Sequence, residues 1–370
     1  MKVNRVFLLS FAVVLILTLS SMLSSCKKNY LNADGSFCSV DAAKQNAKKK
    51  NQDILLIITT GTDDLMSELF IKNVLTTDVF KNSITKKYTV LHMDFSEDSY
   101  QRTVVNPEAD KKTQKVNEEY SQMMFKNAKI ASQLNVTATP AVFLFTQEMY
   151  YISKVIFEED LSNAAQLEVL LNKYEQKIET VHEKVSASKK GSSEERIKAI
   201  DELYEMTDPA YKVFLSELYD VVIDLDKNDK TGLLSKYLVA HANSLSTSYF
   251  MEGKIDEAVN ELLEICKNKY LSQEDRQQSY YMAAYLYAMS GDTNLERMSD
   301  LLQKSIDASP QFQSVNAIVN FKDYIDGMIK DTKIENSASG SNLDINAQSN
   351  PSAGGQIQGG MNYYQSTQDD

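Results

Sequence analysis

The sequence contains few of the side chains that catalysis and metal binding most often use. Its 370 residues include three cysteines, three histidines and no tryptophan. His92 lies in a predicted strand, whereas His182 and His241 lie in unrelated predicted helices. The sequence therefore shows neither a nucleophile with its base nor a set of metal ligands, and we expect no metal and no cofactor.

Positive charge is also scarce, because the formal net charge is -12 at pH 7. Nonspecific binding to nucleic acid needs a basic face, so this balance argues against a nucleic-acid partner. Asp63, Asp64 and Glu68 form an acidic cluster, but the spacing of an EF-hand calcium loop is missing. Acidic residues are common in the first turn of a helix, and we interpret the cluster as such a helix start.

The cysteines show no pairing pattern. Cys38 and Cys266 lie far apart in the sequence, which gives no signature of a disulfide framework. Cys266 falls in a helical pattern, where a buried cysteine behaves as a small hydrophobic residue. Cys38 lies beside a predicted tether, so we expect it to be exposed and regard it as the one candidate reactive thiol.

A long uncharged apolar run occurs at the N-terminus. Lys2 and Arg5 precede VFLLSFAVVLILTL, which is shorter than the roughly 20 residues that span a membrane but suits a signal peptide. The run is followed by Leu-Ser-Ser-Cys, residues 23–26, which resembles a bacterial lipobox. An uncleaved N-terminal helix with a chance cysteine is the alternative.

The lipobox resemblance implies a signal peptide over residues 1–25 and a lipidated Cys26 as the first mature residue. Two acyl chains would then anchor the protein to a membrane of the bacterial cell envelope, on the periplasmic side or the outer surface. Residues 26–38 read as a short polar tether.

Residues 39–186 alternate between helical and strand patterns. The continuous apolar run DILLIITT is typical of a strand that is covered on both faces. The order of predicted elements is helix, strand, helix, strand, helix, two strands joined by a short turn, and a closing helix. This order predicts an α/β domain with a mixed sheet and helices on both faces.

Residues 40–158 resemble the thioredoxin superfamily. The match is carried by AAKQNAKKKNQDILLIITTGTDD, by VLHMDF and by IASQLNVTATPAVFLF. The last stretch reproduces a family pattern, hydrophobic-Val-x-x-x-Pro, at the entry to a strand. The resemblance implies a thioredoxin-like fold, a cis peptide bond between Thr139 and Pro140, and a possible peptide groove beside that bond.

The chain departs from this family where the redox chemistry lies. Leu65 and Glu68 occupy the positions of the two paired cysteines. Thiol–disulfide exchange needs a thiolate at a helix N-terminus and a second thiol one turn later. We therefore expect the fold without the reaction.

The second half of the chain has a different pattern. A Ser/Gly/Lys-rich linker, 187–196, precedes an almost wholly helical region, 197–330, and a Ser/Asn/Gly/Gln-rich tail, 331–370, that is expected to be disordered. Two segments resemble tetratricopeptide repeats, and an ordinary helical bundle is the alternative. The residues that carry this resemblance are Gly253, Asp256 and Ala258 in the first segment and Gly291 and Pro310 in the second.

Taken together, the sequence predicts a membrane-anchored envelope lipoprotein whose two domains bind or scaffold a protein or peptide partner. A thiol–disulfide redox protein that uses Cys38 is one alternative. A structural surface lipoprotein without a specific ligand is another.

Overall fold

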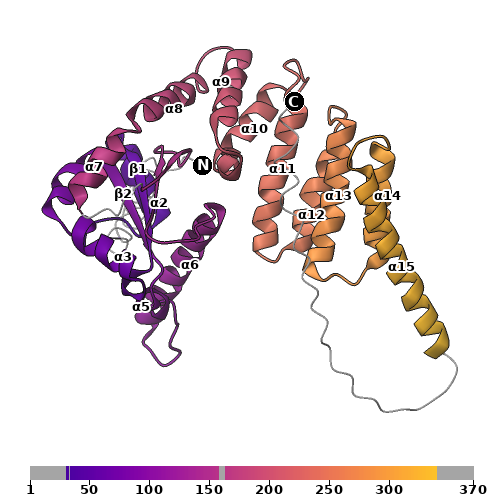
Figure 1. The fold of residues 1–370 in the computed structure, drawn as a ribbon, viewed down its shortest axis with the longest axis horizontal. Helices are drawn as coiled ribbons and strands as arrows, with labels where there is room; N and C mark the ends of the chain where they lie inside the picture. Colours follow the sequence, from indigo (N-terminus) through magenta and orange to yellow (C-terminus); the bar gives the residue numbers. More distant parts are fainter. Residues whose placement is uncertain (1–30, 33, 158–162, 340–370) are drawn as a thin grey trace, which may run out of the picture. The chain divides into compact units, whose positions relative to one another are not determined.

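The computed structural model describes residues 31–339 with the exception of 33 and 158–162. The predicted signal peptide, Cys26 and residues 340–370 lie outside this part of the chain. The described residues form two compact units (Figure 1). The sheet unit comprises residues up to 186 together with Leu203–Phe214, and the helical unit comprises Ala187–Glu202 and the residues from Leu215 onward. Among the described residues, no helix is long and apolar enough to cross a membrane.

The sheet unit is built on four strands, as the sequence pattern predicts. They run in the order β2-β1-β3-β4, with β1 parallel to β2 and the other neighbouring pairs antiparallel. All seven residues of β1 are buried, which agrees with its continuous apolar run. The strands are β1 (Asp53–Thr59), β2 (Tyr88–Asp94), β3 (Ala141–Phe145) and β4 (Tyr151–Val155).

Helices cover the sheet, and alternation along each strand divides its side chains between the two faces. On one face, Ile54 and Leu56 pack with Ala43 of α2 (Val40–Lys50) and with Ile130 of α6 (Lys111–Gln133). The intervening side chains, such as Leu55, point to the other face. The unit also contains η1 (Gly61–Asp63), α3 (Leu65–Phe70), η2 (Ile71–Leu75), η3 (Phe80–Ile84), α4 (Thr85–Lys87), α5 (Glu97–Gln101), α7 (Ala164–Asn172) and α8 (Glu175–Ala187).

Residues 31–38 pack on the sheet, contrary to the predicted free tether. We call them the edge segment. Leu31 forms an antiparallel bridge to Phe37, and Phe37 forms a parallel bridge to Leu91 in β2. The amide of Phe37 donates to the Val90 carbonyl at 2.9 Å, and the amide of His92 donates to the Phe37 carbonyl at 2.8 Å. The edge segment thus extends the sheet beyond β2.

The predicted linker 187–196 is shorter in the structure, because α9 (Ser193–Met206) already begins inside it. Ser192 and Glu195 form a capping box: the Glu195 amide donates to Ser192 Oγ at 3.3 Å, and the Ser192 amide donates to Glu195 Oε2 at 2.8 Å. Reciprocal bonds of this kind satisfy amides at a helix start. They explain why a Ser-rich stretch becomes helical here.

Residues 203–214 belong to the sheet unit, although the sequence places them in the helical region. Within η4 (Pro209–Leu215), the Tyr211 ring stacks on Tyr151 at 4.2 Å between centroids. The Phe214 ring meets Phe145 edge-on at 5.1 Å. Burial of these two aromatic rings against β3 and β4 fixes the segment on the sheet.

In the helical unit, each helix from α10 to α15 packs mainly on its neighbours in sequence (Figure 1). Their shared apolar core includes Leu262, Ala283 and Leu302. The last helix continues to Ser339, so residues 331–339 of the predicted tail are helical, since lengthening an established helix costs little. The helices are α10 (Ser216–Leu225), α11 (Leu234–Met251), α12 (Ile255–Ile265), α13 (Gln273–Ser290), α14 (Leu295–Ala308) and α15 (Val315–Ser339).

Candidate functional site

The first candidate site lies where β1 turns into α3. Gly61 makes this turn with a φ of +59°, a conformation that side chains of L-residues disfavour. A Cβ at Gly61 would lie 2.6 Å from the Cβ of Ser96. The turn therefore requires glycine for both conformation and space.

Asp64 caps the N-terminus of α3. Its carboxylate accepts hydrogen bonds from the amides of Met66 at 3.3 Å and Ser67 at 2.9 Å. Thr139 Oγ1 donates to the same carboxylate at 3.3 Å. These hydrogen bonds, led by the one from the Ser67 amide, hold the pKa of Asp64 below its usual value.

The Thr139–Pro140 loop meets the same turn. The peptide bond between Thr139 and Pro140 is cis. Thr60 Oγ1 lies 3.1 Å from Thr139 Oγ1 and 3.3 Å from Ser67 Oγ. Thr60 and Asp64 thus join two features that the sequence analysis identified separately, the start of α3 and the proline loop.

The two positions at which the thioredoxin resemblance implies paired cysteines lie on the surface. Leu65 is 65% exposed, and Glu68 is also exposed. Leu65, Met66 and Leu69 are all exposed large apolar side chains of one short helix, and we call them the α3 apolar surface. The site presents hydroxyls, a carboxylate and apolar carbon, but none of its residues is a thiol.

Cys38 is buried, contrary to the expected exposure. Its side chain packs with Met123 and Met124, and its carbonyl accepts a hydrogen bond from Asn127 Nδ2 at 2.8 Å. Burial raises the pKa of the Cys38 thiol, which disfavours the thiolate needed for exchange. Cys266 is buried as expected, and burial raises its pKa to about 11.

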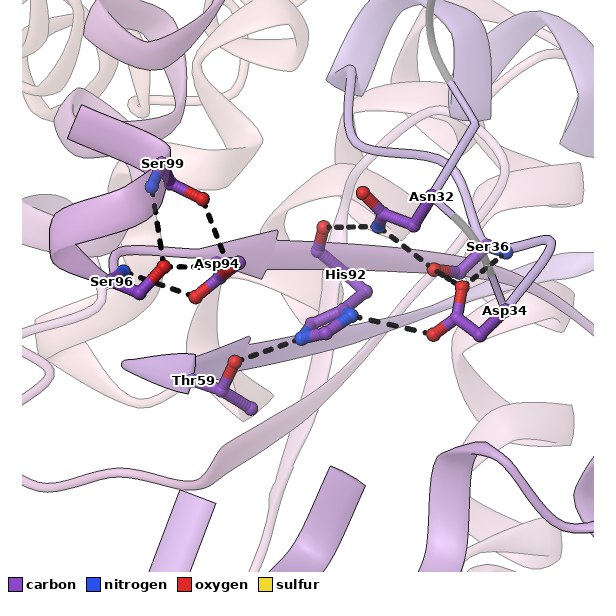
Figure 2. Close-up of polar contacts among 8 residues, drawn as sticks. All are labelled: Asn32, Asp34, Ser36, Thr59, His92, Asp94, Ser96 and Ser99. Atoms are coloured by element: carbon purple, nitrogen blue, oxygen red, sulfur yellow. Dashed lines mark hydrogen bonds and ion pairs between the residues drawn. The ribbon is translucent and has the colours of Figure 1, made fainter. Parts of the chain in front are cut away.

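A second polar cluster lies at the β2 edge of the sheet and was missed in the sequence. Figure 2 shows the His92 ring between Thr59 of β1 and Asp34 of the edge segment. His92 Nε2 lies 2.8 Å from Thr59 Oγ1, and His92 Nδ1 lies 3.5 Å from Asp34 Oδ2. Asp34 Oδ1 also accepts from the Ser36 amide at 2.8 Å and the Ser36 hydroxyl at 2.6 Å.

The charge state of Asp34 follows from these contacts. Burial alone would raise the pKa of Asp34, but hydrogen bonds from His92 and Ser36 outweigh it and lower the pKa. An ionised Asp34 favours the tautomer that carries its proton on His92 Nδ1, in which Nε2 accepts a hydrogen bond from the Thr59 hydroxyl.

This carboxylate–imidazole–hydroxyl order resembles a catalytic relay in connectivity, but it is closed to substrates. The Thr59 residue is 0% exposed and His92 is 6% exposed. A nucleophile must reach its substrate, so we assign the cluster a structural role in docking the edge segment. The sequence signal that could have revealed it is the turn-forming Asn-Ala-Asp-Gly-Ser at residues 32–36, which we had interpreted as tether.

A third group of contacts supports the Gly61 turn (Figure 2). The Asp94 carboxylate accepts from the Ser96 amide at 3.0 Å and from the hydroxyls of Ser96 and Ser99, each at 2.9 Å. Ser96 in turn caps α5 by accepting from the Ser99 amide at 3.3 Å. These bonds place Ser96 against the glycine and keep the end of β2 next to the candidate site.

In the helical unit, the residues singled out in the sequence lie in turns and helix contacts. Gly253 precedes α12 with a φ of +73°, and Gly291 is the left-handed C-cap of α13. Ala258 is fully buried in α12, and Pro310 follows the C-cap of α14. Each of the four lies in a helix contact or at a helix boundary.

Asp256 links three helices of this unit. The Tyr287 hydroxyl donates to Asp256 Oδ1 at 2.9 Å, and Arg297 Nη2 lies 3.0 Å from the same atom. The Arg297 guanidinium also stacks over the Tyr287 ring at 4.0 Å. Burial raises the pKa of Tyr287 to about 12, so it remains a hydrogen-bond donor at neutral pH.

Across the described ranges, no group of three or more His, Cys, Asp or Glu residues could hold a metal ion. A cavity of about 290 Å³ in the helical unit is lined by residues that include Ser193, Asp224 and Lys230. Its buried carboxylate, Asp226, already accepts from the amides of Lys230 and Thr231.

Two comparisons with known proteins give a match. A family model described as an uncharacterised protein C-terminal domain matches residues 233–331, within the helical unit. Among solved structures, a chain titled DsbH oxidoreductase is similar with a TM-score of 0.28 and 18% sequence identity. That similarity covers 40% of this chain and 90% of the other. Comparison with curated proteins gives no match.

Proposed function

We propose that this protein is a lipid-anchored envelope protein that binds a protein or peptide through a redox-silent, thioredoxin-like unit. The topology supports the thioredoxin-like assignment: β1 pairs in parallel with β2, β3 and β4 form an antiparallel hairpin, and a cis X-Pro bond precedes β3. Membrane attachment is inferred from the signal-peptide pattern and the lipobox that ends at Cys26.

One observation carries the binding proposal. The helix start that would hold an exchange thiol instead exposes Leu65, Met66 and Leu69 beside the proline loop. Exposed large apolar side chains that gather in one place mark interaction surfaces more often than scattered ones do. The adjoining hydroxyl oxygens of Thr60 and Thr139, whose protons are used within the cluster, have lone pairs that can accept from a bound backbone amide.

The helical unit supports the same role as a tetratricopeptide-like scaffold. Successive helices pack on one another around one apolar core, an arrangement that repeat proteins use to build extended binding surfaces. The contacts of Asp256 with Tyr287 and Arg297 hold neighbouring helices together.

Site-specific photo-crosslinking tests this proposal. A photoreactive residue at Leu65 is compared with one at Val169, because both positions are 65% exposed and lie in the same unit. We expect a discrete adduct in envelope extract from position 65 that is absent from position 169. Equal labelling at both positions, or no adduct at either, would contradict binding at the α3 apolar surface.

A further inference from the structure

The chain between the predicted anchor and the folded unit is short. Five peptide steps separate Cys26 from Leu31, where the edge segment begins. A fully extended chain spans at most about 3.5 Å per residue, which gives a reach of roughly 18 Å. If residues 26–38 formed a free tether, the reach to Ser39 would be roughly 45 Å.

Several contacts keep the edge segment docked. Besides the two main-chain bonds of Phe37, Asn32 Nδ2 donates to the His92 carbonyl at 3.2 Å. The Asp34 side chain is 9% exposed and faces His92. Release of the segment would leave the buried His92 without its carboxylate partner, which disfavours release. The chain between Cys26 and the folded unit therefore stays as short as the five peptide steps to Leu31.

We propose that the anchor holds the edge-segment side of the sheet unit against the lipid headgroup surface. This inference rests on the proposed membrane attachment through Cys26. The strand order then runs away from the bilayer, from the edge segment through β2, β1 and β3 to β4. Neighbouring strands lie about 4.8 Å apart, so β4 lies roughly 19 Å from the edge segment and is the strand farthest from the bilayer.

Two basic residues at the anchor, Lys27 and Lys28, suit an anionic headgroup surface. Lys126 of α6 marks this side of the unit: it is exposed and paired with Asp41 at 2.7 Å, and its neighbour Asn127 contacts the edge segment through the Cys38 carbonyl. Basic residues close to a membrane are attracted to acidic lipids within about a Debye length. Because the α3 apolar surface lies at the strand ends rather than at this edge, it stays open to a partner.

Short-range fluorescence quenching tests the orientation. The acylated full-length protein is labelled at Lys126→Cys or at Lys154→Cys, which is exposed on β4, and inserted into phosphatidylethanolamine–phosphatidylglycerol vesicles that carry a headgroup spin label. Cys38 and Cys266 are buried and should not compete for the label. We expect about threefold stronger quenching at position 126, given the roughly 18 Å reach of the tether.

A longer tether provides the control. Insertion of about twelve Gly and Ser residues after Lys28 leaves the folded units unchanged, and flexible linkers of this kind impose no orientation. The insertion should remove the difference between the two labels. The mass of the N-terminal peptide separates the possible failures: an unacylated Cys26 overturns both proposals, whereas equal quenching of the acylated, native-length protein overturns only the orientation.

Discussion

The two polar clusters of the sheet unit contain similar residues in opposite environments. The cluster around His92 joins an aspartate and a threonine in the interior, whereas the cluster around Asp64 joins an aspartate with Thr60 and Thr139 near the surface. The buried cluster has the connectivity of a catalytic relay but no access to a substrate. The surface cluster has access but contains no thiol, and its carboxylate is engaged in capping α3. Exposure, more than residue type, therefore separates the structural role of one cluster from the proposed binding role of the other.

The largest expected effect is the loss of the Asp34 carboxylate. Asp34→Ala removes the buried acceptor of the Ser36 amide and hydroxyl, and the carboxylate that faces His92. A buried polar group left without its partner typically costs about 1–3 kcal/mol, and this substitution affects several such groups. We expect the sheet unit to lose stability and the helical unit to keep it. Amide hydrogen exchange of β1 and β2, compared with that of α13, measures the two units separately.

The matched control for Asp34 is an exposed ion pair of the same unit. Lys126 and Asp41 lie 2.7 Å apart, and their side chains are 61% and 62% exposed. Lys126→Ala should change stability by at most about 1 kcal/mol. A loss as large as that of Asp34→Ala would remove the distinction between buried and exposed polar contacts.

The buried cluster should also respond to acid. Because the folded-state pKa of Asp34 lies below its ordinary value of 3.8, its stabilising contribution is complete above about pH 4 and is lost as the pH falls through the folded-state pKa. Urea unfolding of the native chain and of Asp34→Asn should therefore differ most at neutral pH. A difference that grows toward pH 3 would contradict the contacts assigned to Asp34.

Gly61→Ala should have an intermediate effect. The substitution forces an alanine into a left-handed conformation and places its Cβ 2.6 Å from Ser96 Cβ. Such a change typically costs about 1–3 kcal/mol and should shift the start of α3. Gly35→Ala is the comparison, because its φ is +86° but no atom lies within 4 Å of the added Cβ. Equal losses of thermal stability in the two variants would show that the left-handed backbone conformation alone, and not the contact with Ser96, sets the cost.

The smallest effect on stability is expected at the surface cluster. Asp64→Ala removes an N-cap, which typically costs about 1 kcal/mol. If the binding proposal holds, the same change should lower the crosslinking yield from position 65 by more than the small loss of folded protein accounts for. Thermal unfolding and crosslinking yield of one preparation give both values. A stability loss that matches Asp34→Ala would place Asp64 among the structural residues.

Much of the sheet unit could be predicted from the sequence because β1 and β3 are short and continuously apolar. The run around Leu55 and the entry to β3 after Pro140 gave the strand positions and the mixed sheet. The site was predicted only in part: Asp64 was identified as part of a helix start, but its bond to Thr139 and the contacts of Thr60 were not. Hydroxyl–carboxylate bonds between residues about 75 positions apart leave no periodic trace in a sequence.

The remaining errors have a common physical origin, which is long-range packing of short segments. The edge segment carries too few apolar side chains to indicate a strand. It is held by main-chain bonds to Val90 and His92, which are distant in sequence. Tyr211 and Phe214 lie in a helical pattern, but they pack on the rings of Tyr151 and Phe145. By contrast, the Ser-x-x-Glu capping box at Ser192 was a local signal that could have been recognised.

Disulfide reduction by the purified mature chain, compared with its Cys38→Ser variant, tests the central claim most directly. We expect background turnover for both proteins, because α3 carries no thiol and Cys38 is buried with a raised pKa. Turnover that is present in the native chain and lost in the variant would contradict a redox-silent sheet unit.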